Sequence, residues 1–144
     1  MDTLTSEKRS WNMSRIRGAN TKPELAVRSM LHRMGYRFRI SNKTLPGRPD
    51  IVLPKYRAVI FVHGCFWHRH QGCKYAYTPK SRLDFWGRKF EGNVMRDKNN
   101  LSLLKKTGWL PIVVWECKIK RNADAALGRV SAILQRRLKK LVAA

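Results

Sequence analysis

The sequence has few acidic residues. Nine Asp and Glu stand against 31 Lys and Arg among 144 residues, so the formal net charge is +22. A folded domain tolerates this self-repulsion best when its partner is a polyanion. Because the basic residues run from Lys8 to Lys140, we expect one broad positive face and not a detachable tail. Nucleic acid is therefore the expected partner, and an anionic membrane surface is the alternative.

The chain also lacks long apolar runs, and it has only three cysteines. No stretch approaches the roughly 18 apolar residues that a membrane-spanning helix needs. Residues 1–11 are polar where a secretory signal would have an apolar region. We therefore expect an intracellular protein without a membrane partner, in which the cysteines bind metal or are simply buried.

The spacing of hydrophobic residues predicts one α/β domain. Residues 1–20 lack periodicity and are interpreted as a basic arm that contacts the partner, and residues 21–144 form the folded domain. A capping pattern at Thr21 begins a helix that Gly35 ends. Strands are expected at 36–40, 50–53, 58–62 and 110–115, and further helices at 81–90, 93–106 and 123–141. This order predicts a mixed central sheet flanked by helices, with 58–62 and 110–115 as its central strands.

Asp50 is the acidic residue whose position best suits catalysis. It follows Pro49 and opens a hydrophobic strand, and a short turn separates that strand from the one that ends at Val62. Adjacent strands would bring the Asp50 carboxylate close to the Val62–His63 backbone. A carboxylate and a main-chain carbonyl form a hard-oxygen site that suits Mg²⁺. The alternative is an Asp that merely terminates a turn.

Four other residues could serve this site. Glu24 and Asp97 could hold the water molecules of a hydrated metal ion, although helix capping alone also explains Glu24. His63 and His68 could transfer protons, because imidazole titrates near neutral pH.

Cysteine and histidine cluster in a second place. Cys65, His70 and Cys73 lie in one loop, and Cys117 follows the strand at 110–115. Three thiolates and one imidazole would complete a tetrahedral Zn²⁺ site with no open position, so the zinc would be structural. His68 is a rival ligand to His70, and three buried thiols without a metal are the alternative.

Aromatic residues accompany this loop. Phe66 and Trp67 lie among polar and metal-binding residues, where a hydrophobic core is not expected. Beside so much positive charge, their rings could stack on bases or wedge between them. Met13 in the arm could do the same from the opposite groove, whereas Phe85 is interpreted as a core residue.

Six stretches of the sequence carry a family resemblance. They are Asn12-Met13, Leu45-Pro-Gly-Arg-Pro-Asp50, Phe61-Val-His-Gly-Cys-Phe-Trp-His68, Phe85-Trp86, Asn93-Val-Met-Arg-Asp97 and Val114-Trp-Glu-Cys117. In this order, over nearly the whole chain, they resemble the very-short-patch repair endonucleases, which nick DNA at T:G mismatches.

The resemblance implies a restriction-endonuclease-like fold with catalytic Mg²⁺ and structural Zn²⁺. The implied reaction is hydrolysis of the phosphodiester 5′ to the mismatched thymine in double-stranded DNA. Such mismatches arise when 5-methylcytosine is deaminated, so a cytosine methyltransferase and general mismatch-repair proteins are the implied functional companions. We expect a single endonuclease domain over residues 21–144, acting as a monomer in the bacterial cytoplasm at the nucleoid.

Residue roles follow from the resemblance. Asp50 and the Val62 carbonyl match the Mg²⁺ ligands, and His63 stands where related nucleases have a catalytic Lys. His68 matches the general base or water-orienting group, and Glu24 and Asp97 match residues that support the hydrated metal. The implied zinc ligands are Cys65, His70, Cys73 and Cys117, and the implied intercalating residues are Phe66, Trp67, Trp86 and Met13.

The chain departs from the family pattern at two places. Val62 stands where Thr is expected, and the loop from His68 to Cys73 has fewer histidines and one more residue. Two other functions stay open: a non-catalytic, zinc-stabilised DNA-binding module, and a nuclease with a different mismatch or sequence target. Asp50 separates the first of these from an enzyme, because a binding module gains from losing an acid that repels phosphate.

Overall fold

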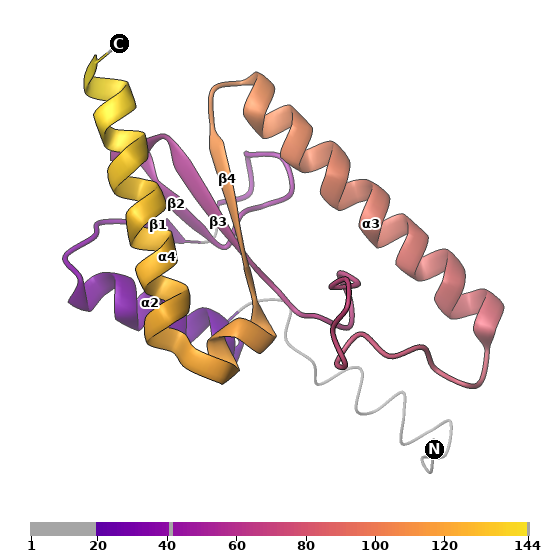
Figure 1. Ribbon diagram of the computed structural model, residues 1–144. Coiled ribbons are helices and arrows are strands. Elements are labelled where there is room, and N and C mark those ends of the chain that lie inside the picture. Colours follow the sequence, from indigo (N-terminus) through magenta and orange to yellow (C-terminus); the bar gives the residue numbers. More distant parts are fainter. Residues whose placement is uncertain (1–19, 41, 144) are drawn as a thin grey trace.

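A computed structural model describes residues 20–40 and 42–143 (Figure 1). Residues 1–19 of the predicted basic arm at 1–20, and with them the predicted contact from Met13, lie outside the described residues. In the described part of the chain, no helix is both long enough and apolar enough to cross a membrane.

Helix α2, Lys22–Arg33, begins and ends as its sequence predicts. Thr21 is the N-cap, and its hydroxyl oxygen accepts a hydrogen bond from the Glu24 amide at 3.4 Å. Gly35 follows the helix with φ +87°, a left-handed conformation that glycine adopts without steric cost. Val27 and Leu31 are fully buried, so the predicted apolar face does pack on the core.

Four strands form one mixed sheet. The strands are β1 (Arg39–Ile40), β2 (Ile51–Leu53), β3 (Ala58–His63) and β4 (Leu110–Trp115), in the order β1-β2-β3-β4. The first three are antiparallel neighbours, and β4 runs parallel to β3. A short 3₁₀ turn, η1 (Pro54–Tyr56), joins β2 to β3. The mixed sheet is therefore confirmed.

The prediction that β4 is a central strand is wrong. Within the described residues β4 is an edge strand, and it contains Pro111, which has no amide hydrogen to donate. Its apolar sequence has another cause, because both of its faces are covered. Ile112 and Val114 belong to the core on one side, and Val113 packs on the smaller core on the other side.

The strand predicted at 36–40 is shorter in the structure. Only Arg39–Ile40 pairs with β2, and both residues are exposed. Tyr36 is buried instead in the core, where its hydroxyl lies 2.6 Å from Ser131 Oγ. Its aromatic ring therefore serves packing between helices and not a sheet face.

Two helices differ in extent from their predictions. Helix α3, Leu83–Lys106, is continuous through Gly92, where two helices were expected. Helix α4, Glu116–Ala143, begins earlier than the predicted 123–141 helix. A break at Asn122, with extended φ and ψ of −161° and 93°, separates its first turns from the predicted part. The Asn122 side chain accepts from the Ala125 amide at 3.1 Å, so it caps the segment that the pattern does predict.

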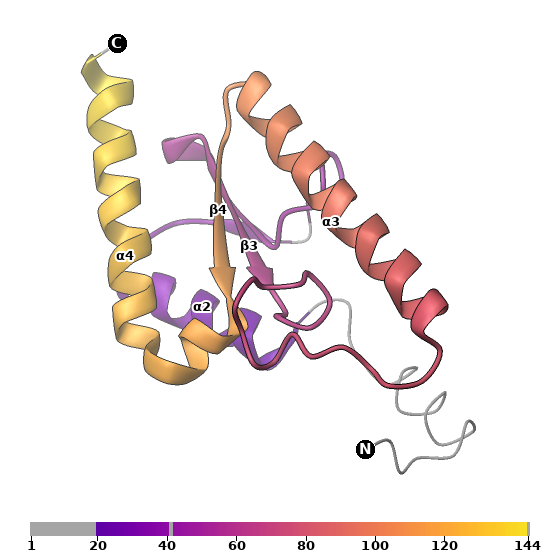
Figure 2. The ribbon, with the colours of Figure 1, turned by 45° about the vertical axis from the view of Figure 1, so that its right-hand side comes forward.

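The helices cover the two faces of the sheet. α2 and α4 lie on one side and α3 on the other (Figures 1 and 2). The larger core lies under α2 and α4, and a smaller one, which includes Val59, Phe61 and Leu104, lies under α3. Because β3 and β4 are parallel, both end at the same edge, where the long loop from 64 to 82 begins.

Candidate active site and metal cluster

Asp50 lies immediately before β2, opposite the end of β3. The antiparallel register pairs Ile51 with Ile60, and the Val62 amide donates to Asp50 Oδ2 at 2.6 Å. The predicted closeness of this carboxylate to the Val62–His63 backbone is confirmed. Burial raises the pKa of Asp50 to about 6, against the hydrogen bond from Val62, which lowers it.

A cavity of about 530 Å³ opens at this edge of the sheet. Its lining includes Val62 and all five of the residues predicted to be catalytic, which are Glu24, Asp50, His63, His68 and Asp97. These residues come from α2, the start of β2, the end of β3, the loop after it, and α3. Segments that are far apart in sequence thus form one acidic and imidazole-containing site.

Glu24 takes part in capping α2 and also lines the cavity. Its amide takes part in capping α2, and its carboxylate accepts from the Asn20 amide at 2.9 Å. The carboxylate is nearly buried, lines the cavity and pairs with Arg28 at 3.2 Å. Its negative charge also contributes to the raised pKa of Asp50.

His63 and His68 stack face to face. Their ring centroids are 3.8 Å apart, with 3° between the ring planes, and His68 Nδ1 lies 2.7 Å from Asp97 Oδ2. Burial, and then the positive charge that His68 can carry, lower the pKa of His63 to about 4. His63 is therefore neutral near pH 7, and His68 is the imidazole that has a carboxylate partner for a proton.

The side chains of His63, His68 and Asp97 offer possible metal-ligand atoms within 4.8 Å of one another. The stacking disfavours a shared metal ion, however. The nitrogen lone pairs of two parallel rings lie in parallel planes and do not converge on one point. The His63–His68–Asp97 group is better suited to proton transfer.

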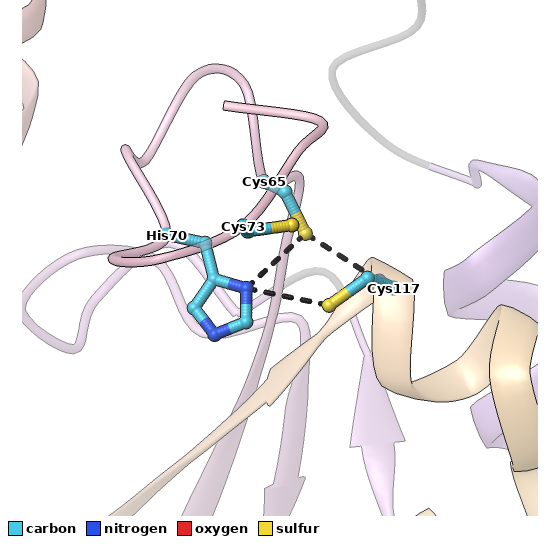
Figure 3. Close-up of side chains that lie close together, drawn as sticks. All are labelled: Cys65, His70, Cys73 and Cys117. Atoms are coloured by element: carbon cyan, nitrogen blue, oxygen red, sulfur yellow. Dashed lines mark hydrogen bonds between the residues drawn. The ribbon is translucent and has the colours of Figure 1, made fainter. Parts of the chain in front are cut away.

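The second cluster contains all three cysteines (Figure 3). His70 Nδ1 lies 3.6 Å from Cys65 Sγ and 3.3 Å from Cys117 Sγ, and the ligand atoms of these residues and Cys73 all lie within 4.8 Å. Tetrahedral Zn–N and Zn–S bonds would place N and S about 3.6 Å apart. This donor set therefore fits zinc, with no protein position left open.

His70, and not its rival His68, belongs to this cluster, because His68 faces Asp97 in the cavity. Burial raises the pKa of Cys65 to about 12, so a thiolate here needs a cation beside it. The Cys117 amide donates to Cys65 Sγ at 3.4 Å and joins the loop to the first turn of α4.

Reasoning from the sequence gave no role to two residues at this edge of the sheet, Trp115 and Glu116. Trp115 stacks on His70 at 4.2 Å and meets His63 edge-on at 5.2 Å, so it separates the two sites. Glu116, the first residue of α4, lines the cavity and pairs with Lys120. The parallel pairing of β3 with β4 places Trp115 beside His63. That pairing is the signal that could have found both residues.

The aromatic residues form a cluster centred on Phe66. Its ring lies 5.1 Å from Trp67, 5.5 Å from Trp86 and 5.2 Å from Phe90. Phe66, Trp67 and Trp86, which are predicted to intercalate, are half-buried. The core interpretation of Phe85 is wrong, since Phe85 is 40% exposed. Phe90, one turn further along α3, supplies the buried contact instead.

These features define a class: an α/β domain with a carboxylate and imidazole site suited to phosphodiester hydrolysis, and a separate Cys₃His cluster that could hold a metal. The family model of DNA mismatch endonuclease Vsr matches residues 1–74.

Curated relatives match most of the chain. Type II nicking enzyme V.XorIIP of Xanthomonas oryzae is 52% identical over 118 residues, 82% of this chain and 86% of the relative. Type II nicking enzyme V.NmeAIP of Neisseria meningitidis is 47% identical over 122 residues, 85% of this chain and 86% of the relative. DNA mismatch endonuclease Vsr of Escherichia coli is 44% identical over 112 residues, 78% of this chain and 71% of the relative. The chain belongs to the Vsr family of DNA mismatch endonucleases.

Proposed function

We propose that this protein nicks double-stranded DNA 5′ to the thymine of a T:G mismatch by Mg²⁺-dependent hydrolysis. The observation that carries the proposal is that the Asp50 carboxylate, which accepts from the Val62 amide near the end of β3, shares one cavity with the His68–Asp97 pair. Membership of the Vsr family supports cleavage of DNA, and the relatives named as a mismatch endonuclease and as nicking enzymes support a nick at a mismatch.

Asp50 and the Val62 carbonyl are the proposed Mg²⁺ ligands. The Val62 amide faces Asp50, and the amide and carbonyl of one strand residue point to the same side. The Val62 side chain is then not needed, which makes Val at this position compatible with activity. Burial is the largest cause of the raised pKa of Asp50, and a bound cation would favour the charged form. When bound, Mg²⁺ supplies positive charge that stabilises the negative charge developing on the phosphate.

His68 is the proposed general base. A carboxylate only accepts hydrogen bonds, so His68 Nδ1–H donates to Asp97, which leaves Nε2 free to take a proton from the attacking water. Asp97 then stabilises the resulting imidazolium. His63, held neutral by burial, packs against His68 and keeps its ring in place. Glu24, oriented by Arg28, is proposed to hold water near Asp50.

The Cys₃His cluster is proposed to hold structural Zn²⁺, which would tie the loop to α4 next to the catalytic cavity. Phe66, Trp67 and Trp86 are proposed to enter the base stack at the mismatch, where unstacking costs least. The order of helices and mixed strands is consistent with a restriction-endonuclease-like fold. The separate arm, the DNA contact of Met13, the monomeric state, the methyltransferase link and the location at the nucleoid remain predictions.

The decisive experiment incubates purified protein with duplexes that differ only in one T:G or T:A pair, with and without Mg²⁺. Asp50→Ala is tested alongside. We expect a nick on the thymine strand with T:G and Mg²⁺ only, and none with the variant. Tight binding to both duplexes without cleavage would favour the DNA-binding module, and cleavage at another mismatch would change the target.

A further inference from the structure

Arg69 lies between the proposed base His68 and the cluster ligand His70, but it takes part in neither site. It falls in the stretch where the chain departs from the histidine-rich family pattern. Its backbone has φ +54°, a left-handed conformation that is uncommon for residues other than glycine. Such a conformation persists where the surrounding structure holds it, and the Arg69 side chain makes several contacts with its own loop.

The Arg69 guanidinium binds three carbonyls of its own loop. Nη1 donates to the Phe66 oxygen at 3.3 Å and to the Tyr77 oxygen at 3.0 Å. Nη2 donates to the Ala76 oxygen at 2.8 Å and approaches Thr78 Oγ1 at 3.5 Å. These contacts use both terminal nitrogens, so little donor capacity is left for a DNA phosphate. The contacts join the first part of the loop, around Phe66 and Arg69, to its later part at Ala76 and Tyr77.

The same guanidinium connects the loop to α3. Its carbon lies 3.9 Å from the centre of the Phe90 ring, a cation–π distance, and Phe90 is the buried aromatic residue of that helix. A planar guanidinium can stack on a ring with its face while its edge donates hydrogen bonds, which a Lys ammonium cannot do. Arg69 thus fixes the Phe66 backbone at the point where the Phe66 ring meets Trp67, Trp86 and Phe90.

We propose that Arg69 is a positioning residue for mismatch recognition, because it holds the aromatic wedge of Phe66, Trp67 and Trp86 assembled before DNA binds. This inference rests on the proposed function. A wedge that is ordered in advance avoids the entropy cost of ordering aromatic side chains in the complex. That saving applies only where the wedge enters the base stack, which is easiest at a poorly paired step. Arg69 therefore strengthens binding to mismatched DNA selectively.

The test compares Arg69→Ala and Arg69→Lys with the wild type and with Arg88→Ala. Arg88 is an exposed α3 residue whose Nε donates to the Asp84 carbonyl of the same helix, so its variant controls for the lost charge. Dissociation constants for T:G and T:A duplexes are measured without Mg²⁺, and zinc content and melting temperature are measured for every variant. Mismatch preference is the ratio of the two constants.

We expect Arg69→Ala to lose about tenfold in mismatch preference through weaker T:G binding, with zinc retained. Arg69→Lys, which keeps the charge, loses preference to a smaller extent, whereas Arg88→Ala weakens both duplexes equally. Near-ultraviolet circular dichroism of Arg69→Ala should also lose intensity, because the packed tryptophans become mobile.

Unchanged preference in Arg69→Ala with zinc bound overturns the proposal. Equal weakening of both duplexes, with a shallower salt dependence, also overturns it and makes Arg69 a phosphate contact. If Arg69→Ala loses zinc, Arg69→Lys becomes the deciding variant. Full mismatch preference in folded Arg69→Lys would refute the positioning role of Arg69. A wild-type protein without any preference would instead refute the proposed function itself, and this inference with it.

Discussion

The candidate catalytic cavity and the Cys₃His cluster are neighbours, but the cavity is open whereas the cluster has a complete set of metal ligands. Both lie at the end of β3 and β4, and Trp115 separates them by touching His63 on one side and His70 on the other. In the cluster, the ligand atoms of four residues lie within 4.8 Å of one another, so a tetrahedral ion would have all its positions filled by protein. In the cavity, burial raises the pKa of the half-buried Asp50 to about 6, although the hydrogen bond from Val62 and the charge of Arg28 lower it.

This difference indicates that the two sites at this edge of the sheet contribute to different properties of the protein. A closed donor set has no position for substrate, so its contribution is to stability. An open, partly desolvated carboxylate costs stability until a cation and substrate arrive, so its contribution is to activity. Substitutions on the two sides of Trp115 should therefore have different effects on activity and on melting temperature.

The sharpest contrast is expected from Asp50→Ala. Loss of the proposed metal ligand should reduce the nicking rate by about a thousandfold or more, with no loss of melting temperature. Single-turnover cleavage of a T:G duplex measures the rate. Glu91→Ala removes an exposed α3 carboxylate outside the cavity and serves as the control. Near-normal cleavage by the Asp50 variant would remove Asp50 from the active site.

Cys73→Ala should show the reverse behaviour. Without the proposed zinc, the loop would lose its connection to α4, and the free energy of unfolding should fall by about 3 kcal/mol or more. Metal analysis and thermal denaturation measure the two losses. A variant that is metal-free and inactive but keeps the wild-type melting temperature would contradict a structural role. The comparison of the two sites would then fail.

His68→Ala tests the proton-transfer role within the cavity. Removal of the proposed base should reduce the rate by about a hundredfold, whereas zinc content and melting temperature stay unchanged. Loss of zinc in this variant would show that His68 and not His70 is the fourth ligand. The pH–rate profile distinguishes a lost base from a misplaced substrate, because only a lost base removes the titration seen in the wild type.

The smallest expected effect is on stability, and it depends on pH. The folded pKa of Asp50 is raised from 3.8 to about 6, so its contribution to stability is fully present below pH 3.8 and is lost as pH rises through 6. Without Mg²⁺ at pH 7.5, Asp50→Asn should therefore be more stable than the wild type by about 1–2 kcal/mol. The difference should vanish near pH 4.

Denaturation with urea at both pH values measures this effect. His63 has the opposite dependence, since its folded pKa is lowered to about 4 and its contribution is lost as pH falls from 6.5. It is present in both proteins and cancels in the comparison. Added Mg²⁺ should stabilise the wild type and not the variant. Equal stability at pH 7.5 would show that Asp50 is ionised without cost.

Short-range features of the molecule were predictable from the sequence. The Thr21 cap and Gly35 delimit α2, because both act on backbone groups within a few residues. The Asp50–Val62 contact was also predictable, because a short turn leaves two successive strands little choice but to pair. The spacing of Cys65, His70 and Cys73 similarly indicated a metal cluster within one loop.

Long-range features were not predictable, since they depend on which segments meet. The apolar run at 110–115 identified a strand, but only the packing of both its faces on helices explains why an edge strand is so apolar. The contact of Arg69 with Phe90 joins the loop to α3, two segments whose relative position no local pattern encodes.

The chemical types at the two sites, the spacing of the loop ligands and the Asp50 hairpin follow from the amino-acid sequence, because they depend on residue identity and on short connections. The fold is needed to show that Glu116 joins the cavity, that His70 and not His68 faces the cysteines, and that Trp115 stands between the sites. The physical reason is the parallel pairing of β3 with β4, a contact between strands separated by a loop and a 24-residue helix.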